Sequence, residues 1–345
     1  MVAFMRQPKA AGSKEYALAA ESWRAIQARG PADGAPEADP RMRSDKFQRG
    51  HMLAIYWETV GRWALMRAKR DALALRTPLY LLQAADRAEP PMSRDDAAKL
   101  MNHYNPHETG GMHGLLGVHV GMRVRLTEHL DKAHGLVKDA EGIVVRVEVD
   151  PRDQESVDAA AAAGAGKARE VYLRHLPLGI WLRMDKLTNS PCVEVLEEER
   201  PGVFDSTDTD SLYLLLPSST IFPFKWREYA VHRTGFPLTH GAVRTSTACQ
   251  GKTLRHGVIV DCARRESGAH PMEEEDWWLH LYVMLSRATS LDDLLLLRAP
   301  DADFLLRGPP ADLRVRLAIF ARRVRATRTR AEALARSFGF EAFLR

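Results

Sequence analysis

The sequence predicts an α/β fold in which a parallel sheet is interrupted by a small β-rich insert. Two segments late in the chain, HGVIVD (256–261) and DDLLLLRAP (292–300), carry runs that are apolar on both faces, which is typical of strands inside a covered parallel sheet. Between residues 110 and 226, apolar and polar residues alternate in short runs separated by turn residues. This alternation favours a small antiparallel β-barrel.

The composition is that of a globular protein. The chain has 345 residues, of which 45% are hydrophobic and 27% charged, and this length allows two compact domains. No apolar run approaches the roughly 18 residues that a membrane-spanning helix needs, which excludes a membrane protein. The three cysteines, Cys192, Cys249 and Cys262, are widely spaced and form no CxxC pair, which excludes a disulfide scaffold and a zinc ribbon. We expect an intracellular protein.

Residues 1–45 are rich in Ala, Gly and Pro and predict a flexible lead-in with one helical stretch, Lys14 to Arg29. Glu15 and Glu21 argue against a mitochondrial presequence, because transit peptides are poor in acids. We favour a nuclear location and keep a mitochondrial one as the alternative.

The segment 46–109 carries the first part of the α/β pattern. In order, we expect a strand at 51–57, a helix at 58–75, a strand at 77–86 and a helix at 93–104. The first helix is amphipathic, with Trp63, Met66 and Leu73 near one face. Ser93 is a good N-cap for the second helix, because its hydroxyl oxygen can accept a hydrogen bond from a free backbone amide.

The insert and the second α/β segment follow. In the insert, 110–226, we expect strands at 120–130, 141–150, 169–184 and 219–226, with a low-complexity Ala/Gly loop at 156–168. In the segment 227–310, we expect strands at 237–246, 256–261 and 292–300 and a helix at 276–288.

Positive charge is concentrated in a helical tail, 311–345. The tail has nine arginines against three acidic residues, although the whole chain has a net charge of only +4. Such asymmetry indicates either a basic appendage for nucleic acid or the solvated face of a helix.

Two short patterns suggest chemistry that the chain does not support. GKT (251–253) would end a P-loop, GxxxxGK[ST], only if a glycine stood at position 246, where this chain has Ser246. The histidines at 103, 107, 113 and 119 are interrupted by Pro106, so the first two cannot lie on one helix face as zinc ligands would. We therefore predict no P-loop and no metal site.

Two other segments, RTSTACQGKTL (244–254) and YVMLSRATSLDDLLLL (282–297), contain groups suited to phosphate. Thr245, Ser246 and Thr247 place small hydroxyls after a strand, where backbone amides can also bind an anion. Arg287 stands near the end of a helix. It could reach a phosphate across a cleft, or it could pair with the carboxyl end of its own helix. The residues alone leave both alternatives open.

Together, these segments resemble motifs V and VI of the superfamily 1B helicases, the RecD-like and Pif-type group. The matching residues are Gln250, Gly251, Thr253 and Leu254 in the first, and Tyr282, Val283, Leu285, Ser286 and Arg287 in the second. The segment 120–145 is similar to the start of the barrel that this family inserts. The resemblance covers 110–300 well and 50–90 weakly.

The resemblance implies a second, RecA-like helicase domain made of 46–109 and 227–310, with the barrel inserted. It implies an ATP-dependent 5′-to-3′ DNA helicase that uses ATP and Mg²⁺ and acts in DNA repair, recombination or telomere maintenance. Arg287 would be the arginine finger, beside Gln250 and Gly251 at the nucleotide. The residues implied in nucleic-acid binding, with single-stranded DNA favoured, are Thr245, Ser246, Thr247, Thr253, Arg123 and Arg125.

The sequence departs from the family pattern in several places. The family's motif V histidine and lysine fall on Thr247 and Ala248, and the barrel's asparagine positions carry His129 and Lys138–Asp139. A P-loop domain and its Asp-Glu magnesium motif have no counterpart in these residues. We therefore expect the C-terminal half of a helicase, incomplete as a catalyst without a P-loop domain in cis or in trans.

Three hypotheses remain from the sequence. The chain is a helicase half, a non-catalytic nucleic-acid-binding remnant, or a structural or interaction protein that keeps only the fold. The first predicts that Arg287 and the Gln250–Gly251 turn share one edge of the sheet, outside the carboxyl ends of its strands. It also predicts a partly exposed guanidinium without a carboxylate partner, whereas pairing with Asp261 or Asp292 would favour a structural role.

Overall fold

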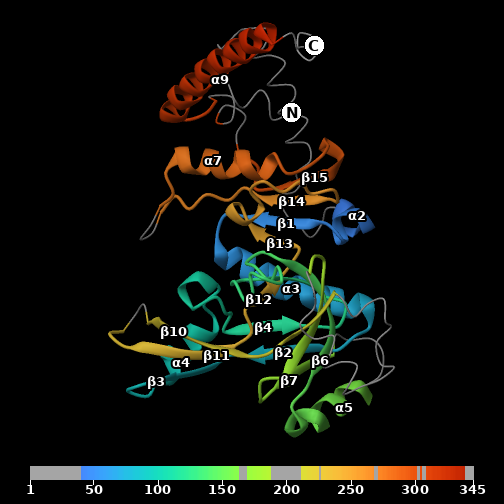
Figure 1. Ribbon diagram of the computed structural model, residues 1–345. Helices are drawn as coiled ribbons and strands as arrows, with labels where there is room; N and C mark the ends of the chain where they lie inside the picture. Colours follow the sequence, from blue (N-terminus) through green and yellow to red (C-terminus); the bar gives the residue numbers. More distant parts are fainter. Residues whose placement is uncertain are drawn as a thin grey trace. The chain divides into compact units, whose positions relative to one another are not determined.

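The computed structural model describes residues 40–162, 169–187, 211–224, 227–267, 271–300, 304 and 308–338 (Figure 1). The chain divides into two compact units, one formed by Arg49–Cys249 and the other by Met1–Gln48 with Gln250–Arg345. The expected helical stretch at 14–29 lies outside the described residues.

The larger unit begins with strand β1 (His51–Ala54) and helix α3 (Trp57–Leu75). Strand β1 is shorter than expected and α3 starts one residue earlier than expected. The apolar face of α3 was predicted wrongly in part, because Met66 and Leu73 are about half exposed. The side chains that α3 buries are mostly small, such as Ala68 and Ala72, and small side chains allow the helix backbone to approach its neighbours closely.

The expected strand at 77–86 is two strands. β2 (Leu79–Gln83) lies between β4 (Leu115–Val118), which is antiparallel to it, and β7 (Glu170–Leu173), which is parallel. β3 (Ala85–Ala88) instead pairs with β11 (Ala230–Gly235), whose other neighbour is β10 (Ser218–Pro223). The chain therefore passes from one sheet to another at Ala84.

The expected strand at 237–246 is divided in the same way, into β12 (Leu238–His240) and β13 (Val243–Thr245). β12 pairs with β5 (Arg123–Leu126) and continues an antiparallel sheet through β6 (Glu141–Glu148), β8 (Gly179–Met184) and β9 (Leu212–Leu215). β13 pairs in parallel with β1, with Val243 opposite Met52. A Cβ on Gly241, between them, would lie 3.2 Å from the backbone of Arg123, so a glycine suits this close approach.

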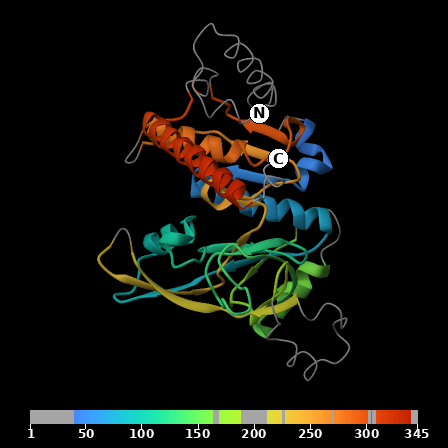
Figure 2. The same ribbon diagram turned by 45° about the horizontal axis from the view of Figure 1, so that its top comes forward.

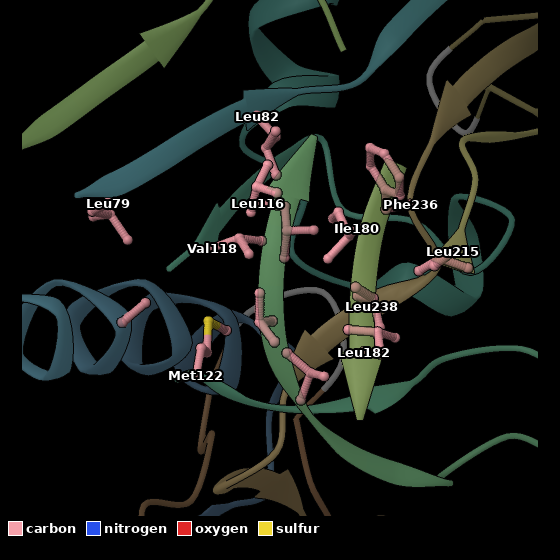
Figure 3. Packing of buried hydrophobic residues seen from close by; sticks show 14 of the residues in the cluster. Leu79, Leu82, Leu116, Val118, Met122, Ile180, Leu182, Leu215, Phe236 and Leu238 are labelled. Atoms are coloured by element: carbon pink, nitrogen blue, oxygen red, sulfur yellow. The ribbon is translucent and has the colours of Figure 1, made fainter. Parts of the chain in front are cut away.

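The main core of the larger unit lies between the sheet that contains β2 and β4 and the antiparallel sheet that contains β8. Figure 3 shows Leu82 of β2 and Leu116 and Val118 of β4 on one side and Ile180 and Leu182 of β8 on the other. Each of these side chains is buried. Burial of apolar surface at roughly 25 cal/mol per Å² makes such a cluster the main stabilising contribution to the unit.

Two helices complete the larger unit. α4 (Arg94–Met101) begins as predicted, since the Ser93 hydroxyl accepts a hydrogen bond of 3.1 Å from the amide of Asp96. The low-complexity segment was predicted to be a loop, but its first part belongs to helix α5 (Gln154–Ala162). Alanine has the highest helix propensity, which explains this difference.

The smaller unit contains the second parallel pair, β14 (Val258–Asp261) and β15 (Leu294–Leu297), with Val258 opposite Leu294. All eight residues are buried. Helix α7 (Glu274–Leu285) comes before β15. Helix α9 (Ala311–Ser337) is a single helix of 27 residues without a buried side chain (red in Figure 2). None of the described helices is both long and apolar enough to span a bilayer.

Candidate functional site

Arg287 lies two residues beyond the end of α7 and is partly exposed. Three N–H groups of its guanidinium donate hydrogen bonds to uncharged acceptors. Nε donates to the Val283 carbonyl at 2.9 Å and to the Ser286 hydroxyl at 3.2 Å, Nη1 to the Lys252 carbonyl at 2.9 Å and Nη2 to the Ser286 hydroxyl at 2.6 Å. Among the described residues, no carboxylate forms an ion pair with it. Asp261 pairs with Arg298 instead.

The two motif segments meet at this arginine. The amide of Leu254 donates to the Arg287 carbonyl at 3.0 Å, and Leu254 and Ala288 form an isolated parallel bridge. Lys252, whose carbonyl receives the guanidinium, directly follows Gly251. The expected proximity of Arg287 and the Gln250–Gly251 turn is therefore present.

This junction lies at the opposite end of the strands from the one that we predicted. Leu254 precedes β14 by four residues, and Ala288 precedes β15 by six. Both segments therefore approach the amino ends of these two strands, whereas we expected them outside the carboxyl ends. The reason is that α7 runs back along the parallel pair, so that the end of the helix meets the start of the next strand.

The backbone conformation at position 251 favours a glycine. Its φ is +77°, in the left-handed region, and an added Cβ would have no atom within 4 Å. The glycine is therefore favoured by its φ angle alone, because an L side chain is strained there even in open space. Gln250 beside it is exposed, so the turn presents both residues to solvent.

Arg287 has unused hydrogen-bonding capacity. A guanidinium carries five N–H groups, and three of them are used in the contacts above, so two have no acceptor within the described part of the chain. A positive, partly exposed group with free N–H groups fits a phosphate oxygen. The bond to the Val283 carbonyl also caps the last turn of α7, which is the other role that the sequence left open.

The hydroxyl residues of the first segment differ in exposure. Thr245 and Ser246 are buried, at 3% and 2% exposure, whereas Thr247 and Thr253 are exposed. The Thr245 hydroxyl lies 3.1 Å from that of Thr247 and accepts a hydrogen bond from the Ala248 amide at 3.3 Å. The Thr245 hydroxyl therefore stabilises the turn. Of these three threonines, only Thr247 and Thr253 are exposed at the surface.

The two arginines of β5 point in different directions. Arg123 is exposed and pairs with Asp185, whereas Arg125 is buried, with Nη1 at 2.6 Å from Asp139. Burial is the main cause that lowers the pKa of Arg125 to about 10. Because a side chain that is 2% exposed cannot reach a ligand at the surface, Arg123 is the candidate of this pair that remains accessible.

Sequence reasoning missed Arg244. It lies in the middle of β13, fully buried, with Nη2 at 2.7 Å from the carboxylate of Glu141 in β6. The distance fits an ion pair, but no guanidinium hydrogen is aligned for a hydrogen bond. The sequence contained one indication of this ion pair. Arg244 stands between Val243 and Thr245 in a short strand, and a charged side chain that is buried there needs a buried partner of opposite charge.

GKT (251–253), close to Arg287, is the segment most similar in pattern to a phosphate-binding loop, but it has Ser246 where that loop has a glycine. Throughout the described residues, no three His, Cys, Asp or Glu side chains gather into a group that could hold a metal ion.

The comparisons with known proteins give structural similarity only. No protein-family model matches the sequence, and no curated protein matches it. The chain is similar to the structure of Pif1 helicase from Candida albicans, with 15% identity and a TM-score of 0.42 over 90% of this chain and 58% of that one.

Two structures of Bacteroides Pif1 are similar as well. One, bound to ssDNA, has 13% identity and a TM-score of 0.45 over 91% of this chain and 50% of the other. The second, a complex with ADP-AlF3 and ssDNA, has 14% identity and a TM-score of 0.41 over 91% and 55%. The chain thus spans about half the length of the Pif1 helicases that it resembles in structure.

Proposed function

We propose that this chain is the C-terminal half of an ATP-dependent 5′-to-3′ DNA helicase. In this proposal it supplies an arginine finger, Arg287, and part of the surface for single-stranded DNA. The observation that carries the proposal is the junction of the two motif segments, where the Leu254 amide binds the Arg287 carbonyl and the guanidinium binds the Lys252 carbonyl.

The chemistry assigned to Arg287 is electrostatic. ATP with Mg²⁺, held by a P-loop domain, would supply the phosphoryl group that is transferred to water. The two unused N–H groups of the guanidinium would then face the negative charge that develops on the phosphoryl oxygens. A finger of this kind accelerates hydrolysis by about 10³–10⁵. The bonds to Val283 and Lys252 fix its direction in advance.

For nucleic acid, the exposed members of the predicted set are the natural contacts. Thr247, Thr253 and Arg123 are at the surface of their units, and hydroxyls and guanidinium groups bind phosphate oxygens without regard to base sequence. In this proposal the buried members, Thr245, Ser246 and Arg125, position the exposed ones.

A second candidate is a protein that keeps the helicase fold without its catalysis. The observation in favour of it is the capping of α7, because the bonds of Arg287 to Val283 and Ser286 would be useful in any protein of this fold. Such a protein would be a nucleic-acid-binding remnant or an interaction module.

The test is ATP hydrolysis by the full chain mixed with a separately produced P-loop domain of a Pif-type helicase, with single-stranded DNA present. We expect turnover above that of the P-loop domain alone, and Arg287→Ala should reduce the stimulated rate by about 10³-fold or more. Arg62→Ala, an exposed arginine of α3, is the matched control and should leave the rate unchanged.

Two results would contradict the proposal. One is the absence of stimulation although the two proteins form a complex. The other is an Arg287→Ala variant as active as the wild type. The second candidate would then be favoured.

A further inference from the structure

The seven-residue pattern of α9 is the feature that no part of the proposed function uses. From Leu313 to Leu334, seven positions follow one another at alternating intervals of four and three residues. Five of them carry large apolar side chains, namely Leu313, Leu317, Phe320, Val324 and Leu334, and positions 327 and 331 carry Thr and Ala. We call these five residues the α9 seam. Such spacing places them on one line along a helix, as the a and d positions of a coiled coil.

The α9 seam is exposed to solvent. Leu317 is 41% exposed, Phe320 65%, Val324 48% and Leu334 59%, and no residue of the helix is buried. Leaving several large apolar side chains in water is unfavourable, and a continuous apolar stripe of this kind marks an interaction surface. An amphipathic helix gains most of its stability by burying such a stripe against another element.

The residues beside the seam are almost all arginine. Arg316, Arg323 and Arg330 occupy the g positions, and Arg314 and Arg328 occupy two of the e positions. The only acidic residues of α9 are Asp312 and Glu332. Each forms an exposed i,i+4 pair, Asp312 with Arg316 at 3.3 Å and Glu332 with Arg328 at 2.8 Å, and exposed pairs of this kind contribute little.

We propose that the α9 seam docks an acidic amphipathic helix of a partner protein. The partner would place apolar side chains against the seam and Glu or Asp at its own e and g positions. The guanidinium groups beside the seam can then form bidentate contacts with carboxylates at the edge of the interface. The e and g charges are the residues that select the partner in paired helices.

Charge argues against the two other occupants. In a second copy of α9, the g-position arginines would face one another in an antiparallel pair, and Arg323 would face Arg328 in a parallel pair. Like charges at these positions are destabilising, and neither arrangement supplies a carboxylate to the arginines. A nucleic acid would use the arginines, and a base could stack on Phe320, but it has no apolar surface that would bury the aliphatic Leu317, Val324 and Leu334 along the helix. The inference is independent of the proposed function, because it does not involve Arg287.

The experiment measures binding of the full chain to a synthetic helix, three heptads long, with Leu at a and d and Glu at e and g. We expect saturable binding by fluorescence anisotropy, weakened more than about tenfold by the double change Leu317→Ser and Phe320→Ser, because the lost apolar burial is in the interface. The matched control is Val315→Ser with Ile319→Ser, at 60% and 41% exposure but off the seam. It should bind as the wild type does.

A second variant tests the charges. The triple variant Arg316→Glu, Arg323→Glu and Arg330→Glu should no longer bind the acidic helix. It should instead bind the same helix with Lys at the e and g positions. Salt-dependent binding of single-stranded DNA should persist in the seam variant, since all its arginines remain.

Several outcomes would overturn the inference. Equal binding by the seam variant, or an equal loss in the control, would show that the seam is not the interface. A wild-type dimer that the seam variant lacks, measured by sedimentation, would identify a second copy as the occupant. A parallel loss of DNA binding in the seam variant would identify nucleic acid.

Discussion

The main-chain amide of Leu254 donates to the carbonyl of Arg287 at 3.0 Å, and this bond joins two segments that are more than thirty residues apart in the sequence. Side chains reinforce the junction, because the guanidinium of Arg287 binds the carbonyl of Lys252. The backbone of Arg287 is therefore fixed by the same turn that its side chain contacts, which holds the guanidinium in a defined direction.

Gly251→Ala should lower the free energy of unfolding by about 1 kcal/mol, because φ is +77° and the cost is backbone strain only. Gly251→Asn should cost less, since asparagine tolerates the left-handed region. Gly257→Ala is the comparison. Its Cβ would lie 2.6 Å from the Phe47 ring and 2.9 Å from the Lys46 carbonyl, so its loss should be larger. Urea unfolding measures the free energy of unfolding of all three variants. An equal loss in Gly251→Ala and Gly257→Ala would contradict the conclusion that backbone strain alone acts at Gly251.

The isolated chain should show no ATP turnover above background, even with single-stranded DNA. The reason is that neither a P-loop nor an Asp-Glu magnesium motif occurs in its sequence, and a finger acts only on a nucleotide that is already held. A coupled assay on highly purified protein measures this. Turnover that Arg287→Ala abolishes would show that the chain holds its own nucleotide.

Stability should fall as the pH decreases from about 6.5 towards 4, in part through His113. This histidine is buried, and burial lowers its pKa to about 4. The unfolded chain therefore binds a proton in a pH range where the folded chain does not, which favours unfolding by up to about 3 kcal/mol.

His113→Gln isolates this contribution. Urea unfolding at pH 7.5 and pH 4.5 should show a smaller pH-dependent loss in the variant than in the wild type. Other histidines with a lowered pKa, such as His240, keep part of the dependence in both proteins. The same pH dependence in the two would mean that His113 is solvated or protonated in the folded state.

Binding of single-stranded DNA should depend steeply on salt, and removal of residues 311–345 should reduce that dependence. Each neutralised phosphate of a single strand contributes about −0.7 to the slope of log affinity against log salt, and the deleted residues include nine arginines. Titrations at several salt concentrations measure the slope. If deletion leaves both affinity and slope unchanged, the arginines of the tail do not contact phosphate.

Sequence reasoning was most successful where a signal is local. Ser93 and the start of α4 were predicted because an N-cap acts on the next turn of its own helix. The segments at 77–86 and 237–246 were each predicted as one strand, and each is two strands in different sheets. Which sheet a strand joins depends on partners far away in the chain, so local apolar runs do not reveal the change.

The candidate site shows the same difference between what could and what could not be predicted from the sequence. The proximity of Arg287 to the Gln250–Gly251 turn was expected because the two motifs resemble those of a helicase family, which implied a RecA-like domain that brings them together. The burial of Thr245 and Arg125 was not predicted, since hydroxyl and guanidinium groups are usually found at surfaces. Their inward direction depends on partners such as Asp139 that are distant in sequence.

The short connection at Gly241 couples the registers of two sheets. β12 is fixed against β5 and β13 against β1, and only Gly241 and Ala242 lie between them. Because strand side chains alternate, one inserted residue here would reverse either strand. If β13 turned over, the buried Arg244 would exchange places with Val243 and Thr245, and the ion pair between Arg244 and Glu141 would be lost. The segment that leads into the Thr247 turn should therefore tolerate substitution better than any change in its length.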